Sequence, residues 1–261
     1  MNYEDELEDV IIYEEEVKGH PIKMYFMGGG LQSASFVEEG KHFDLLFPYM
    51  EHFHRVFSWK KEIKKVLLLG TGVYTFPKYL ISHHEDLVVE VVDIDPSVEE
   101  TARRYFYLDE LETKYNLKEN KRLQTHIIEA RSYLKYTLEV YDAIFDDAFI
   151  GQVPAFSLLT IEAAKLVYEK LKEDGIYVVN LPGYEDSTES KLLAEVNNTF
   201  QQVFPYVYFV SATVENHIFS TSNYFMFASK KELDVKDAIV VEKSEVIYYD
   251  RDIERLKNED F

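Results

Sequence analysis

KVLLLGTGVYTFPKYLISHHEDLVVEVVDIDP, residues 65–96, is the stretch that decides the fold. It opens with an apolar run at 66–69 and breaks at Gly70-Thr71-Gly72, where two glycines without a Cβ allow a tight turn and close approach of the backbone to a ligand. A helix should follow, with Thr75 as its N-cap. A second apolar run at 88–92 completes a strand-helix-strand unit.

Asp93 ends the second apolar run, roughly 20 residues beyond the glycine turn. A nucleoside cofactor presents its ribose hydroxyls at this point, and a carboxylate can accept their hydrogen bonds. The dinucleotide fingerprint requires a third small residue where Thr75 stands, so a single-nucleoside ligand such as S-adenosylmethionine fits better than NAD. In the alternative interpretation, the glycines only turn the chain and Asp93 caps a helix.

The composition indicates a globular, acidic protein. The 261 residues are 46% hydrophobic, enough for one large core or two modest ones. A net charge of −20 argues against binding to nucleic acid or to an anionic membrane and would attract a cationic ligand such as a polyamine, unless it serves only solubility. There is no cysteine for a disulfide or a thiolate zinc site. With an acidic N-terminus and no apolar run near 18 residues, we expect a cytoplasmic protein.

The first 40 residues differ in pattern from the rest of the chain. Two β-prone runs, 10–17 and 22–27, surround Gly19-His20-Pro21, so residues 1–40 are predicted to form a small antiparallel β-domain. A helix is expected over residues 41–57, because aromatic and apolar side chains recur there every three or four positions.

Strands and helices then alternate up to residue 230. After the first unit, the expected strands are 123–128, 141–145, 176–181, 206–210 and 224–229. This order predicts a doubly wound α/β domain over residues 41–230, with a seven-stranded sheet that is parallel except for one antiparallel strand. Residues 231–261 form a C-terminal extension whose role the sequence does not reveal.

Acidic residues follow several of these strands, at the sheet edge where such folds bind ligands. Glu129 could accept a hydrogen bond from the exocyclic amine of adenine, or could be an ordinary acid in the first turn of a helix. Asp146 and Asp147 are adjacent, so only one of them can face a cleft. That carboxylate could take a proton from an attacking amine or stabilise a sulfonium cation. The alternative is two solvated loop acids.

Two other kinds of site are not predicted. His42, His52 and His54 have no further ligand at metal-binding spacing, so we expect no metal site. No G-x-S-x-G segment occurs that would indicate a serine nucleophile.

Several segments between about residues 10 and 230 resemble the spermidine synthase family. They are MGGGLQS at 27–33, VVDID at 91–95, IIEARSYL at 127–134, YDAIFDDAF at 141–149 and TSNYFMFASK at 221–230.

The resemblance implies a Rossmann-like methyltransferase fold with a small N-terminal β-domain, and the family's homodimer. It places Gln32 in the active site, Asp93 on the ribose, Glu129 on the adenine and Asp147 at the first catalytic aspartate. The co-substrate would be S-adenosylmethionine or its decarboxylated form.

Three positions depart from the family pattern. Val73 replaces the loop aspartate, Ile150 replaces the second aspartate of D-S-S-D, and His42-Phe43-Asp44 stands for Y-H-E. The segment at 147–154 is similar to the spermidine-synthase-like branch, whose members are often described as methyltransferase-like.

These observations predict a transferase that moves a methyl or aminopropyl group to an amine-type acceptor, with polyamines among the candidates. Val73 favours the methyl donor, because an acid there would repel the carboxylate of intact S-adenosylmethionine. Val73 and Ile150 also support an alternative, a non-catalytic nucleoside-binding protein. A third hypothesis is a structural or partner-binding role, suggested by 20 Tyr and 18 Phe.

Overall fold

The N-terminal part of the chain forms its own antiparallel sheet. The structure, a computed structural model, describes residues 2–7, 10–28, 30–151, 153–183, 187–212 and 223–257. The sheet has four strands in the order β1 (Asn2–Leu7), β2 (Val10–Val17), β3 (His20–Met27) and β4 (Gly30–Phe36). The predicted hairpin is confirmed as β2 and β3, and the structure adds a strand on either side of it.

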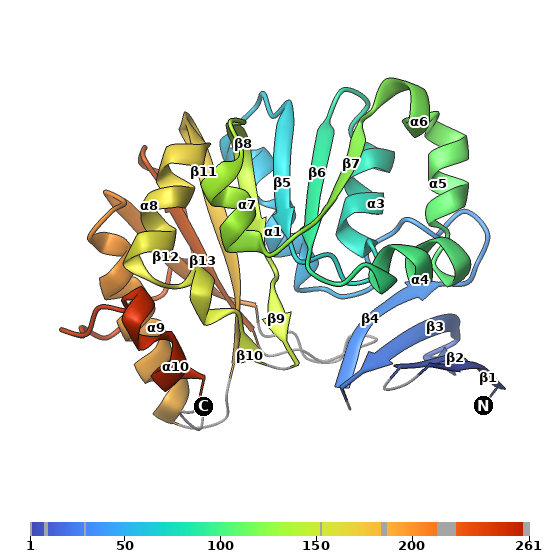
Figure 1. The fold of residues 1–261 in the computed structure, drawn as a ribbon, viewed down its shortest axis with the longest axis horizontal. Helices are drawn as coiled ribbons and strands as arrows, with labels where there is room; N and C mark the ends of the chain where they lie inside the picture. Colours follow the sequence, from blue (N-terminus) through green and yellow to red (C-terminus); the bar gives the residue numbers. More distant parts are fainter. Residues whose placement is uncertain are drawn as a thin grey trace.

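The second sheet has seven strands in the order β12-β13-β11-β8-β5-β6-β7 (Figure 1). β13 pairs antiparallel with both neighbours and the other pairings are parallel, as predicted. The strand bounds are β5 (Lys65–Leu69), β6 (Val88–Asp93), β7 (Leu123–Ile127), β8 (Tyr141–Asp146), β11 (Leu171–Pro182), β12 (Tyr206–Ser211) and β13 (Asn223–Ser229). The chain reverses its winding direction at β5, between β8 and β6, where such sheets bind ligands.

Helices cover both faces of this sheet (Figure 1). On β5, Val66 and Leu68 belong to one hydrophobic core, while Leu67 and Leu69 belong to the other, because successive side chains of a strand point to opposite faces. The helices before β8 are α1 (Met50–His54), α2 (Val56–Trp59), α3 (Thr75–His83), α4 (Ser97–Tyr105), α5 (Leu108–Tyr115), α6 (Leu117–Asn120) and α7 (Ala130–Tyr136).

After β8, a two-stranded ribbon precedes the remaining helices. It consists of β9 (Phe149–Ile150) and β10 (Val153–Pro154). The helical elements that follow are η1 (Phe156–Leu158), α8 (Ile161–Lys170), α9 (Ser187–Gln201), η2 (Asp250–Asp252) and α10 (Ile253–Leu256). No helix in the part of the chain that the structure describes is long and apolar enough to cross a membrane.

Two local predictions were wrong. The helix expected over residues 41–57 is a series of turns until α1 begins at Met50, because Pro48 has no N–H and disfavours a helical conformation at the residue before it. Thr75 is the first residue of α3 rather than its N-cap, which is Tyr74 in a left-handed conformation. The Thr75 hydroxyl is instead 2.9 Å from the Ser33 hydroxyl, in a hydrogen bond that joins α3 to β4.

The C-terminal extension covers the second core. Ile239 forms an isolated antiparallel bridge with Phe209 of the edge strand β12. Tyr248 and Leu256 are fully buried in the core between the sheet, α8 and α9. The extension therefore protects a sheet edge and completes the hydrophobic core on that side.

Candidate functional site

A cleft of about 590 Å³ lies at the carboxyl ends of β5, β6, β8 and β11. Tyr25, Gln32 and Ser33 of the N-terminal sheet line its other side. All the predicted cofactor-binding residues line this cleft, namely Gly70, Gly72, Asp93, Glu129 and Gln32. The topology thus brings together residues that are nearly 100 positions apart in the sequence.

The glycine turn after β5 is packed against the protein itself. A Cβ on Gly70 would lie 2.6 Å from the carbonyl oxygen of Asp147, and Gly70 has φ +80°. A Cβ on Gly72 would lie 3.4 Å from the Ser33 hydroxyl. At Gly70 the backbone therefore packs closely against the end of β8. This contact places the Asp147 backbone beside the glycine turn.

Asp93 is fixed at the tip of β6 by the glycine turn. One carboxylate oxygen accepts hydrogen bonds from the backbone N–H of Thr71, at 3.1 Å, and from its hydroxyl, at 2.8 Å. The other oxygen accepts from the backbone N–H of Asp95, at 3.0 Å. The carboxylate therefore has one orientation at the cleft wall, as a ribose-binding acid requires.

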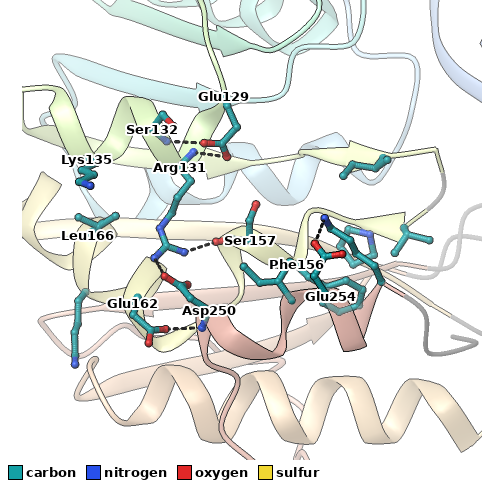
Figure 2. A pocket seen from close by; sticks show the side chains of 16 residues that line it. Glu129, Arg131, Ser132, Lys135, Phe156, Ser157, Glu162, Leu166, Asp250 and Glu254 are labelled. Carbon is teal, nitrogen blue, oxygen red and sulfur yellow. Dashed lines mark hydrogen bonds and ion pairs between the residues drawn. The ribbon is translucent and has the colours of Figure 1, made fainter.

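Glu129 is the N-cap of α7. Its two carboxylate oxygens accept from the backbone N–H groups of Arg131, at 2.9 Å, and Ser132, at 2.7 Å (Figure 2). The sequence left open an ordinary acid in the first turn of the helix. Glu129 is instead the N-cap, one position before that turn, and the cap holds its carboxylate still where Glu129 lines the cleft. The contact of Glu129 with adenine stays a prediction.

Asp147 faces the cleft from the end of β8. Its carboxylate accepts a hydrogen bond from the side-chain amide of Asn180, at 2.7 Å, and Asn180 in turn accepts from Asn223, at 2.9 Å. Burial raises the pKa of Asp147 to about 6, although the hydrogen bond from Asn180 lowers it. The group is therefore an ionised carboxylate at neutral pH with an affinity for a proton well above that of a solvated aspartate.

Asp146 points to the opposite face and does not line the cleft, so the prediction that only one of the pair faces a cleft is confirmed. Its carboxylate accepts from the Tyr177 hydroxyl, at 2.5 Å, and from the backbone N–H of Ala148, at 3.2 Å. Burial, together with the nearby Asp147 carboxylate, raises the pKa of Asp146 to about 7, although the hydrogen bonds from Tyr177 and Ala148 lower it. This position leaves Asp146 out of contact with a ligand in the cleft.

Sequence reasoning missed five polar residues of the cleft: Tyr25, Tyr49, Ser157, Asn180 and Asn223. Burial and the Asp95 and Asp93 carboxylates raise the pKa of Tyr25 to about 12. Burial and Asp147 also raise the pKa of Tyr49 well above its usual value. Asn180 could have been found, because it is the one polar residue in the apolar run of the fifth predicted strand. The tyrosines stand in segments with no local signal.

Two of the family departures lie outside the cleft. The Val73 side chain is fully buried in the first hydrophobic core. His42 stacks on Tyr107 with ring centroids 3.7 Å apart. Ile150, the third departure, does line the cleft. The Val73 side chain therefore adds neither charge nor surface to the cleft, and the preference for the methyl donor that rested on the missing acid stays a prediction.

All the charged side chains in the described lining of the cleft are acidic. The lining includes the carboxylates of Asp93, Asp95, Glu129 and Asp147 and, within the described residues, no lysine, arginine or histidine. Negative charge in a low-dielectric cleft attracts cations and repels anions. No group of three metal-ligating side chains occurs in the described residues.

A larger cavity of about 1060 Å³ lies behind the cleft, between α7, α8, η1 and α10 (Figure 2). It shares Glu129, Ile150 and Ser157 with the cleft. Lysines and acids alternate around it, including Lys135 and Lys165 on the exposed sides of α7 and α8. The strand-end acids converge on the smaller cleft, so that cleft is the candidate active site.

The sheet order, the single antiparallel strand and the acids at the strand ends define a methyltransferase-like α/β protein. A family model, the spermine/spermidine synthase domain, matches residues 47–237, and the chain belongs to this family.

Individual relatives agree with the family. The chain is 29% identical over 244 residues to a polyamine aminopropyltransferase of Thermococcus kodakarensis, covering 92% of this chain and 79% of that protein. It is 31% identical over 144 residues to an N-terminal histidine N-methyltransferase of Emericella nidulans, covering 53% of this chain and 23% of that protein. The crystal structure of a probable spermidine synthase from Corynebacterium glutamicum superposes with a TM-score of 0.66 at 18% identity, covering 88% and 80% of the two chains.

Proposed function

We propose that this protein is an aminopropyltransferase, which transfers the aminopropyl group of decarboxylated S-adenosylmethionine to the amine of a polyamine-type acceptor. The observation that supports this most is the charge of the cleft, with four carboxylates and no basic side chain among its described lining residues. The relationship to a polyamine aminopropyltransferase over 92% of the chain supports it as well.

The charge of the cleft favours the decarboxylated donor over the intact one. Decarboxylated S-adenosylmethionine has a sulfonium and an ammonium group, both cationic. The intact molecule adds a carboxylate, which would lose its hydration among the acids of the cleft without a basic side chain in the described lining to pair with. An amine acceptor, also a cation in solution, fits the same lining.

Each strand end would have one task. The fixed carboxylate of Asp93 would accept hydrogen bonds from the ribose hydroxyls, and Glu129 would accept one from the adenine amine. Gln32, held by a hydrogen bond from its side-chain amide to the Met27 carbonyl at 3.2 Å, would close the other side of the cleft. Asp147 would face the acceptor amine.

Asp147 would act in the transfer step itself. The acceptor ammonium first loses a proton, which the Asp147 carboxylate can accept, and this gives its nitrogen a free electron pair. The nitrogen then forms a bond to the aminopropyl carbon next to sulfur, the carbon–sulfur bond breaks, and the electron pair of that bond neutralises the sulfonium to give 5′-methylthioadenosine. A pKa of about 6 keeps Asp147 ionised at neutral pH while making it a better base than a solvated aspartate.

Release of 5′-methylthioadenosine from decarboxylated S-adenosylmethionine, measured across a panel of diamines and polyamines, tests this function. We expect turnover with at least one amine, and a loss of kcat of roughly 100-fold or more in Asp147→Asn with donor binding retained. Full activity of Asp147→Asn would remove this residue from the mechanism. Binding of the donor without turnover by any amine would support the non-catalytic alternative.

Methyl transfer is the second candidate, because half of the chain is similar to a histidine N-methyltransferase. It predicts that intact S-adenosylmethionine binds more tightly than the decarboxylated form and that S-adenosylhomocysteine is released when an acceptor is added.

A further inference from the structure

One arginine joins two segments of the cleft wall to the C-terminal extension. Arg131 lies in the first turn of α7, two residues after Glu129. Its guanidinium donates to the Ser157 carbonyl, at 2.6 Å, and to the Asp250 carboxylate, at 2.8 Å (Figure 2). Glu129 and Ser157 both line the cleft. The guanidinium therefore bridges the N-terminus of α7 and η1, with the extension as its third attachment.

Asp250 is itself fixed from two sides. Its second carboxylate oxygen accepts a hydrogen bond from the hydroxyl of Thr160, at 2.8 Å. Thr160 is fully buried, caps α8, and also accepts from Arg131 at 2.9 Å. The backbone N–H of Asp250 donates to Glu162 of α8, at 3.0 Å. These bonds place the Asp250 carboxylate at one position relative to α8.

The extension is anchored immediately before it reaches Arg131. The buried Tyr248 donates from its hydroxyl to Glu195 of α9, at 2.6 Å, and from its backbone N–H to Thr199, at 3.0 Å. Its carbonyl accepts from the backbone N–H of Ile161, at 2.8 Å. The segment that delivers Asp250 is thus attached to both α8 and α9 and has little freedom to shift.

We propose that Asp250 and Arg131 are positioning residues for the nucleoside end of the cleft. The C-terminal extension holds the Arg131 guanidinium, and the guanidinium holds Glu129 and Ser157 at the separation that a bound nucleoside requires. This inference rests on the proposed function, in which Glu129 meets the adenine. It gives residues 231–257 a role in ligand binding although the Asp250 side chain itself lines only the cavity behind the cleft.

The ion pair between Asp250 and Arg131 can be removed without unfolding the protein, so its effect on the cleft can be tested. The side chain of Asp250 is 47% exposed, and an ion pair with a partner as exposed as this adds little to global stability. Asp250→Asn keeps the size of the side chain and an oxygen acceptor for Thr160 but removes the charge that orients the guanidinium fork. Asp250→Asn should therefore misplace Glu129 and Ser157 at the cleft without lowering the global stability of the protein.

Calorimetric titration of the full chain with 5′-methylthioadenosine measures binding at the nucleoside end of the cleft. This ligand has no charged tail, so its affinity does not depend on the carboxylates that would meet the tail. We expect Asp250→Asn to weaken its binding by about tenfold, with the melting temperature and the KM for the amine acceptor unchanged. Glu254→Gln is the matched control. It removes a carboxylate of the same extension and the same cavity wall, where Glu254 accepts a hydrogen bond from Lys257 of its own segment at 2.9 Å.

A double variant separates positioning from general damage. If Asp250 acts through Arg131, then Asp250→Asn combined with Arg131→Gln should bind 5′-methylthioadenosine no more weakly than Arg131→Gln alone. Wild-type affinity in Asp250→Asn would overturn the inference, as would a parallel loss of melting temperature and acceptor binding. A wild-type protein that binds no 5′-methylthioadenosine would overturn the proposed function and this inference together. Binding by the wild-type protein and equal binding by Asp250→Asn would overturn this inference and leave the proposed function standing.

Discussion

At the scale of single residues, the end of β8 separates two carboxylates that are adjacent in the sequence. Asp147 enters the cleft and bonds to Asn180, while Asp146 enters the core and bonds to Tyr177. Asp146 is buried and Asp147 is half-buried, and loss of solvation raises the pKa of each. Only Asp147 lies where it could accept a proton from a substrate in the cleft. Asp146 is closed off from the cleft, and its burial lowers the stability of the protein at pH values where the carboxylate is ionised.

The pH dependence of stability should report the buried Asp146. Its folded pKa of about 7 lies above that of an unfolded aspartate, so the folded state binds the proton more tightly. The resulting stabilisation is complete below about pH 4 and is lost as the pH rises through about 7. Asp146→Asn, which still offers an acceptor to Tyr177, should therefore be more stable than wild type at pH 8 by on the order of 2 kcal/mol and equally stable at pH 4.

Urea denaturation at pH 4, 6 and 8 measures this difference. Asp86→Asn, a change at an exposed aspartate, is the control and should shift stability by less than about 0.5 kcal/mol throughout. An equal loss of stability in Asp146→Asn at all three pH values would mean that the Tyr177 hydrogen bond, rather than the charge, dominates at this position.

At the scale of elements, strand ends were predictable and side-chain partners were not. The apolar runs and the glycine turn located β5, β6, β7 and β8 and hence Asp93, Glu129 and Asp147, because the carboxyl ends of parallel strands meet at one edge. The helix expected over residues 41–57 was wrong. Its apolar spacing is that of a helix, but Pro48 interrupts the segment because proline has no N–H to donate. Tyr25 reaches the cleft from another sheet, and no local pattern encodes that contact.

The turn after β5 allows a matched test of its close packing. Gly70 and Gly19 have nearly the same backbone angle, φ +80° and +82°, but a Cβ on Gly19 would meet nothing within 4 Å. Gly19→Ala should therefore lose only about 1 kcal/mol of stability through backbone strain. Gly70→Ala adds a clash with the Asp147 carbonyl and should lose about 3 kcal/mol or more, together with donor binding. Similar losses in the two variants, measured by chemical denaturation, would show that the contact can relax.

At the scale of the whole molecule, the protein consists of a doubly wound sheet whose ligand edge faces a small antiparallel sheet (Figure 1). The net charge of −20 has the same sign as the cleft between the two sheets, which has four carboxylates in its described lining. Such a cleft selects ligands by charge before it selects them by shape. The charge of the donor is therefore the property on which the proposed function most depends.

The most direct test is calorimetric titration of the wild-type protein with decarboxylated S-adenosylmethionine and, separately, with S-adenosylmethionine, at identical pH and salt. The two ligands differ only by a carboxylate, so the ratio of their dissociation constants isolates the effect of the acidic lining. We expect the decarboxylated form to bind at least about tenfold more tightly, equivalent to about 1.4 kcal/mol. Tighter binding of intact S-adenosylmethionine would contradict aminopropyl transfer and indicate a methyltransferase instead.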